Sequence, residues 1–101
     1  PYFFGIANKC EELMWDMNDH PKVRVIRMRR VPFIDSTGIH NLQNLCEMSH
    51  REGTHIVLSG VTPNVYSVLE HNGFCRLLGK DHICPNINVA LERAAAILKR
   101  P

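Results

Sequence analysis

A carboxylate, two hydroxyls and a glycine stand side by side in Asp35–Gly38, directly after an apolar segment and directly before a helical pattern. The start of a helix offers free backbone N–H groups and the positive end of the helix dipole to an anion. Gly38 would let a ligand come close to the backbone. The simpler interpretation is a helix cap, in which Asp35 or Ser36 accepts a hydrogen bond from the first turn. We expect the loop of Asp35, Ser36, Thr37 and Gly38 to contact an anion or a partner.

Basic residues gather just before this loop. Five fall within nine positions, at Lys22, Arg24, Arg27, Arg29 and Arg30. One interpretation is a docking patch made by Arg27, Arg29 and Arg30, for an acidic partner or for anionic lipid headgroups. The other is a set of solvated strand ends with one or two ion pairs, each contributing about 0–1 kcal/mol to stability. The formal net charge of only +2 favours the second interpretation.

Histidines and cysteines form no known metal or catalytic motif in this sequence. Two of each fall within fourteen residues, at His71, Cys75, His82 and Cys84. Structural zinc sites favour closer pairs, such as two cysteines separated by two residues. Ser36 lies in no Gly-x-Ser-x-Gly elbow, and its neighbour His40 is four residues along the same predicted helix. The four widely spaced cysteines indicate reduced thiols. We therefore predict no metal, no cofactor and no catalytic residue.

The composition is that of one ordinary globular domain. The chain has 101 residues, of which 45% are hydrophobic and 22% are charged. Its balanced charge and single tryptophan argue against a nucleic-acid-binding protein. No apolar run approaches the roughly 20 residues that a membrane span needs. The chain opens on Pro1 without an initiator methionine, so we expect a fragment of a longer protein.

Strand and helix patterns alternate along the chain. The predicted strands are Tyr2–Phe4, Val23–Met28, His55–Ser59 and a short edge strand at Ile83. The predicted helices run over residues 6–18, with Glu11, Glu12 and Asp16 turned outward, and then over 39–52, 63–72 and 87–98. Apolar residues of both parities in Val23–Met28 indicate a strand covered on both faces. The alternation predicts an α/β fold with a mostly parallel sheet, in which Val23–Met28 and His55–Ser59 are parallel.

Three motifs follow one another in a fixed order: Phe3–Ala7, Arg27–Gly38 and Leu58–Val61. Together they resemble the STAS domain, a family named after sulphate transporters and anti-sigma factor antagonists, over nearly the whole chain. The resemblance implies one STAS domain over residues 1–101, with a mostly parallel sheet of four to five strands flanked by about four helices. It also implies that the family's first strand is missing, which would leave Tyr2–Phe4 as an open edge and favour self-association.

The Phe-Phe-Gly, Arg-Met-Arg and Leu-Ser-Gly-Val pieces of these motifs resemble the transporter branch of the family. In that branch STAS is the cytoplasmic C-terminal domain of SulP-family anion permeases. The resemblance implies a non-enzymatic regulatory and interaction domain on the cytoplasmic face of the bacterial inner membrane. Its partners would be the membrane domain of the parent transporter and a cytoplasmic protein.

Two other functions stay open. In the soluble antagonists the serine after the aspartate is the target of a kinase, so Ser36 is a candidate phosphorylation site in a free-standing anti-sigma factor antagonist. Phosphate there would add a charge of about −1.5 to −2 beside Asp35 and disrupt a docked partner. The third function is an anion- or nucleotide-binding module that uses Asp35–Gly38. The transported anion is set by the membrane part of a permease and is not encoded in this domain.

Overall fold

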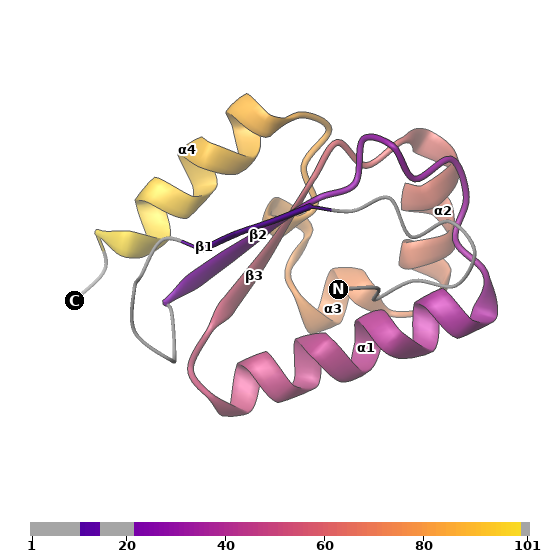
Figure 1. The fold of residues 1–101 in the computed structure, drawn as a ribbon, viewed down its shortest axis with the longest axis horizontal. Coiled ribbons are helices and arrows are strands. Elements are labelled where there is room, and N and C mark those ends of the chain that lie inside the picture. The colour runs from indigo at the N-terminus through magenta and orange to yellow at the C-terminus, as the bar shows by residue number, and fades with distance from the viewer. Residues whose placement is uncertain (1–10, 15–21, 100–101) are drawn as a thin grey trace.

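A three-stranded sheet, in the order β1-β2-β3, lies at the centre of the computed structural model, which describes residues 11–14 and 22–99 (Figure 1). The strands are β1 (Glu11–Met14), β2 (Val23–Arg27) and β3 (His55–Ser59). β2 pairs with β3 in parallel and with β1 antiparallel. The predicted parallel pairing is therefore confirmed, and so is the α/β fold class.

Helices connect and cover these strands. Their bounds are α1 (Ser36–Arg51), α2 (Pro63–His71), α3 (Phe74–Leu77) and α4 (Ile87–Leu98), with a short 3₁₀ helix, η1 (Lys80–His82), before α4. The three longer helices were predicted from their apolar spacing. In the structure Asp35, Thr62 and Asn86 cap α1, α2 and α4 through their side chains. The short α3 and η1 were not predicted, because four residues or fewer carry no helical period.

The helices pack on both faces of the sheet, with α4 on one face and α1, α2 and α3 on the other (Figure 1). Alternating residues of β2 divide between the two cores, since successive side chains of a strand point to opposite faces. Val23 and Val25 pack with Ala90, Ala94 and Ile97 of α4. Ile26 and Met28 belong to the larger core, under α1 and α2. Burial on both faces explains why this strand is apolar at both parities, as predicted.

The predicted edge strand at Ile83 is reduced to a single parallel bridge to Leu58. The Cys84 N–H donates to the Leu58 carbonyl at 2.8 Å, and the Val61 N–H donates to the Cys84 carbonyl at 3.1 Å. Pairing ends there because Pro85 follows, and proline has no N–H to donate.

The predicted helix over residues 6–18 is wrong where the structure describes it, because Glu11–Met14 is the strand β1. The apolar spacing of this segment fits one helix face, but hydrogen bonds to β2 decide the outcome. In the antiparallel register Glu11 lies opposite Arg27, and Met14 opposite Arg24. The sheet thus places an acidic strand position beside a basic one, where the sequence had suggested an acidic helix.

The predicted strand Tyr2–Phe4, the motif Phe3–Ala7 and the outer parts of the predicted helix lie outside the described residues. Within the described ranges, the longest helix is too short and too polar to cross a bilayer.

Candidate functional site

Asp35 is the N-cap of α1. Its backbone is extended, with φ −92° and ψ 178°, and its Oδ1 accepts a hydrogen bond from the Gly38 N–H at 2.7 Å. The Asp35 carbonyl accepts the first helical hydrogen bond, from the Ile39 N–H, at 2.9 Å. The carboxylate therefore occupies the positive end of the helix itself. The interpretation of Asp35 as a helix cap is confirmed.

Ser36 and Thr37 are the exposed part of the predicted loop. Both are in the first turn of α1 and both are solvent-exposed, whereas Gly38 is buried and Asp35 is half-buried. The cap fixes the backbone that carries the two hydroxyls, because the hydrogen bond from the Gly38 N–H to the Asp35 carboxylate spans Ser36 and Thr37. The result is a pair of hydroxyl groups presented to solvent on a rigid helix end.

A pocket of about 410 Å³ opens beside this loop, between α1 and α2. Its wall includes Asp35 and Ser36, and its other residues are Ile34, Ile39, His40, Gln43, Val68 and Asn72. Gln43 Nε2 donates to the Asn72 carbonyl at 3.4 Å, which joins α1 to the end of α2. The His40 ring lies 3.3 Å from the Asn44 side chain through its Nε2. The pocket thus joins apolar side chains with the amides of Gln43 and Asn72 next to Ser36.

The contribution of α2 to this pocket was missed by sequence reasoning. Val68 and Asn72 are separated from Ser36 by more than thirty residues, and no local signal joins them. The one available signal was the α1 periodicity, which places Ile39 and Gln43 on the same side of the helix, four residues apart.

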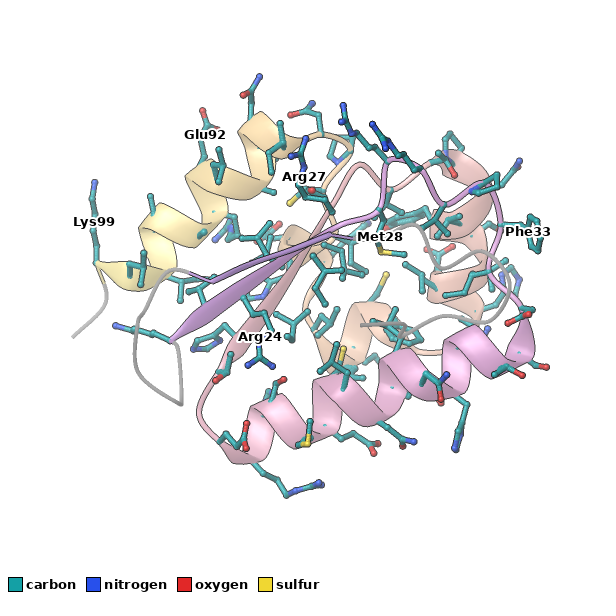
Figure 2. All side chains as sticks on the ribbon, viewed as in Figure 1. Arg24, Arg27, Met28, Phe33, Glu92 and Lys99 are labelled. Atoms are coloured by element: carbon teal, nitrogen blue, oxygen red, sulfur yellow. The ribbon has the colours of Figure 1, made fainter. Side chains whose placement is uncertain are left out.

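The five clustered basic residues divide between the two ends of β2. Arg24 lies near the amino end, where its Nη1 donates to Ser49 Oγ of α1 at 3.4 Å. Arg27 is the last residue of β2 and lies on the α4 side of the sheet, while Arg24 lies on the α1 side (Figure 2). The predicted patch of Arg27, Arg29 and Arg30 therefore lies at the carboxyl end of the strand, and Lys22 and Arg24 are not part of it.

Arg29 and Arg30 are exposed and form the turn that follows β2. The Met28 N–H donates to the Ser59 carbonyl at 2.7 Å, and the Val31 N–H closes the turn on the Met28 carbonyl at 2.9 Å. Gly60, with φ +69°, packs directly on this turn: a Cβ at Gly60 would lie 2.8 Å from both the Cβ and the backbone nitrogen of Arg29. The second and third sequence motifs thus meet at the carboxyl ends of β2 and β3.

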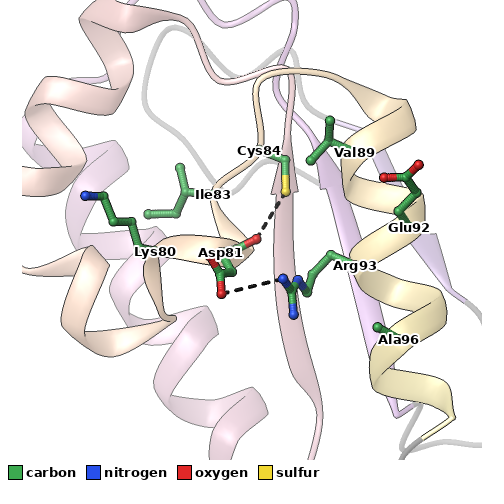
Figure 3. Close-up of a pocket in the computed structure, with 8 residues that line it drawn as sticks. All are labelled: Lys80, Asp81, Ile83, Cys84, Val89, Glu92, Arg93 and Ala96. Atoms are coloured by element: carbon green, nitrogen blue, oxygen red, sulfur yellow. Dashed lines mark hydrogen bonds and ion pairs between the residues drawn. The ribbon is translucent and has the colours of Figure 1, made fainter.

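A second pocket, of about 360 Å³, lies between η1 and α4 (Figure 3). Asp81 and Arg93 face one another across it, with 3.5 Å between Asp81 Oδ2 and Arg93 Nη2, while Lys80 and Glu92 point away. Asp81 is 76% exposed, and an exposed pair of this kind contributes about 0–1 kcal/mol to stability. Cys84 Sγ donates to the Asp81 carbonyl at 3.4 Å, and burial raises the pKa of this thiol. The pocket has balanced charge, and its thiol has a raised pKa.

The histidines and cysteines of the second half of the chain do not share one site, although the rings of His55 and His82 lie edge to face with their centroids 6.1 Å apart. His71 Nδ1 lies 2.8 Å from the Ser67 carbonyl, and Cys75 Sγ lies 3.6 Å from the Tyr66 hydroxyl. His82 Nδ1 lies 3.2 Å from the Ile56 carbonyl. Among the residues that the structure describes, no three His, Cys, Asp or Glu side chains are grouped so that they could hold a metal ion. Cys46, Cys75 and Cys84 are free thiols.

Comparison with known proteins gives one consistent result. The family model of the STAS domain matches residues 1–90. A crystal structure of a sulfate transporter family protein from Wolinella succinogenes is 38% identical, with a TM-score of 0.78, and the match covers 83% of this chain and 69% of that chain. The SulP transporter STAS domain from Vibrio cholerae is 28% identical, with a TM-score of 0.75, and the match covers 85% of this chain and 67% of that one. The search of curated proteins gives no match.

Proposed function

Because this chain belongs to the STAS domain family, we propose that it is the cytoplasmic regulatory and interaction domain of a SulP-type anion transporter. The observation that carries the proposal is its likeness to a sulfate transporter family protein from Wolinella succinogenes, at 38% identity, and to a SulP transporter STAS domain from Vibrio cholerae, at 28% identity. Conserved architecture alone would show only the fold, since one fold serves many functions. The membrane domain of the parent transporter and a cytoplasmic protein are the proposed partners.

The exposed first turn of α1 and the adjoining pocket are the proposed contact surface. Ser36 and Thr37 present hydroxyls to solvent, and the neighbouring pocket adds Ile39, Gln43 and Asn72. Interfaces that form and separate combine apolar contact with hydrogen-bonding groups, as this surface does. The Asp35 cap keeps the backbone of the turn fixed, so a partner would meet a preformed surface.

Contact with a protein fits this turn better than binding of a small anion. The Asp35 carboxylate already accepts the Gly38 N–H and places a negative charge at the helix end. An added anion would have to share the helix dipole with that charge, which lowers the attraction. Catalysis fits no better: a serine nucleophile needs a base within hydrogen-bond reach, and the His40 ring contacts Asn44.

Phosphorylation of Ser36 is the second proposed function, and the exposure of this residue at the first position of α1 favours it. A phosphate would meet the N–H groups of the helix start, which favours order of the helix. The same phosphate would lie beside Asp35 on the contact surface. The two negative charges would repel an acidic partner, and any partner that covers them would have to remove their water. Phosphorylation would therefore change docking more than folding.

The test is anion uptake by cells that express the full-length transporter with Ser36→Asp, Ser36→Ala or no change. Asn64→Asp is the matched control, because it adds one carboxylate to the first turn of α2, at an exposed residue outside the pocket. We expect Ser36→Asp to change uptake severalfold at equal expression, with Asn64→Asp close to wild type. Equal uptake in all four proteins would show that the turn serves only as a helix start.

A further inference from the structure

We propose that the segment Arg29–Phe33 docks on the headgroup region of an anionic phospholipid bilayer. Arg29, Arg30, Pro32 and Phe33 are exposed in this segment, and Val31 is buried. Phe33 is 51% exposed, the largest value among the exposed large hydrophobic residues of the described chain. The proposal rests on the placement of the domain beneath a membrane, as proposed above, and adds the surface that faces the lipid.

The charge around this segment is mainly positive. Between residues 27 and 46 the chain has Arg27, Arg29 and Arg30 but only one acidic residue, Asp35, and across the sheet Glu11 lies opposite Arg27. The Asp35 carboxylate is turned to the Gly38 N–H, where the helix end offsets its charge. The remainder of the chain is neutral overall, with nine basic and nine acidic residues. The charges at this end of the sheet therefore favour its contact with an anionic surface.

Arginine and phenylalanine are close enough to act together. Arg30 and Phe33 are three residues apart, so their Cα atoms are separated by at most about 10 Å. Phe33 points away from the body of the protein where the chain passes from β2 to α1 (Figure 2). An aromatic ring beside cationic groups suits the bilayer interface, where the ring enters the acyl boundary and the guanidinium groups meet phosphates.

The turn that presents the arginines is rigid. Hydrogen bonds from Met28 to Ser59 and from Val31 to Met28 fix its backbone, and Gly60 supports it from below. Buried Val31 fastens the middle of the segment to the larger core. Binding would therefore cost little backbone order. A weak contact is sufficient when the rest of the protein holds the domain at the membrane, because tethering raises the local lipid concentration.

The experiment is flotation of the chain with vesicles of phosphatidylcholine alone or with about one third phosphatidylserine, at millimolar lipid and two salt concentrations. We expect binding only to the anionic vesicles, and loss of it at high salt, because screening shortens the reach of surface charges. Arg29→Gln with Arg30→Gln should lower the partition coefficient about 25-fold, at about fivefold for each arginine. Arg51→Gln, at the far end of α1, is the matched control and should bind as wild type.

The depth to which position 33 enters the bilayer is measured with a single tryptophan. In a Trp15→Phe background, Phe33→Trp carries the only tryptophan of the chain, and Met48→Trp, an exposed control on α1, carries it elsewhere. Brominated lipids should quench position 33 and leave position 48 unchanged. Circular dichroism checks that each variant is folded.

Absence of binding to anionic vesicles, or equal binding by the Arg29→Gln/Arg30→Gln variant, overturns the proposal. If that variant alters transport while the wild-type chain binds no vesicle, the surface belongs to an acidic protein partner, and the membrane proposal is wrong. The Ser36 experiment does not use vesicles, so a failure of either proposal is seen separately.

Discussion

Gly60 and Arg29 are packed so closely that only a glycine fits at position 60. The backbone at Gly60 has φ +69°, and the nearest atoms to a Cβ there would be the Cβ, nitrogen and Cα of Arg29, at 2.8 to 2.9 Å. Two turns whose residues Arg29 and Gly60 are 31 positions apart in sequence are thereby held together at the carboxyl ends of β2 and β3. The geometry of the basic turn depends on the absence of one methyl group.

Replacing Gly60 by alanine should lower the free energy of unfolding by more than a positive φ alone requires. A left-handed backbone costs an alanine about 1–2 kcal/mol, and overpacking against the Arg29 backbone should add about 1–3 kcal/mol. Gly53→Ala is the matched control, because Gly53 has φ +78° and nothing within 4 Å of a Cβ. Urea unfolding of the two variants measures the difference. Equal losses would show that the turns adjust freely.

Removing the carboxylate of Asp35 should destabilise the start of α1. Asp35→Ala loses the hydrogen bond to the Gly38 N–H, and the loss of a helix cap costs about 0.5–2 kcal/mol. Asp35→Asn retains an oxygen acceptor and is expected to keep most of the stability. Chemical denaturation of both variants checks this. A fully stable Asp35→Ala protein would mean that the cap contributes nothing.

Ser36→Asp should leave the folded chain nearly as stable as wild type. The added carboxylate lies in the first turn of α1, where the helix dipole stabilises a negative charge by about 0.3–1 kcal/mol. This stabilisation offsets the repulsion between the new carboxylate and Asp35. Thermal unfolding should give a midpoint within a few degrees of wild type and of Ser36→Ala. A large drop in the midpoint would show that Ser36→Asp destabilises α1. A change in transport by this variant would then report misfolding and not altered docking.

Thiol labelling should distinguish buried cysteines from half-buried ones. Burial, with a smaller effect from Glu47, raises the pKa of the Cys46 thiol to about 12, and burial also raises the pKa of Cys84. Because the thiolate is the reactive form, a maleimide at pH 8 should label half-buried Cys75 first. Mass spectrometry of a Cys10→Ser variant measures the order. Labelling of Cys46 before Cys75 in the folded chain would contradict the burial.

The same pKa shift predicts a pH dependence of stability. The Cys46 thiol has a higher pKa when folded than its ordinary value of 9.0, so the unfolded chain releases this proton first as pH rises. The contribution of Cys46 is complete below pH 9 and is lost progressively between pH 9 and about 12. Between pH 9 and about 12 the free energy of unfolding should therefore fall less steeply with pH in Cys46→Ala than in wild type.

Local signals account for what the sequence predicted correctly. Each of α1, α2 and α4 has apolar residues at helical spacing within its own segment, so these helices could be placed locally. The parallel pairing of β2 with β3 followed from apolar residues at both parities, which only a doubly covered strand needs. The cap at Asp35 was likewise a local property.

Three features that depend on distant parts of the chain were not predicted. β1 has helical apolar spacing, and only its pairing with β2 makes it a strand. The pocket at Ser36 needs Val68 and Asn72 from α2, whose position follows from packing and not from any motif. The basic residues are continuous in sequence, yet Arg24 and Arg27 lie on opposite faces of the sheet (Figure 2).

One face of the sheet is covered by a single described helix, so this side of the fold should open more easily than the other. Of the described helices only α4 lies on this face, and it is attached through small side chains such as Ala90 and Ala94. Detachment of α4 would uncover a strip of valines, Val23, Val25 and Val57, while the larger core under α1 and α2 stayed closed. Such a partial opening needs less free energy than global unfolding. Amide hydrogens of α4 should therefore exchange with solvent earlier than those of α1, and the exposed valine strip would be the first aggregation-prone surface of the domain.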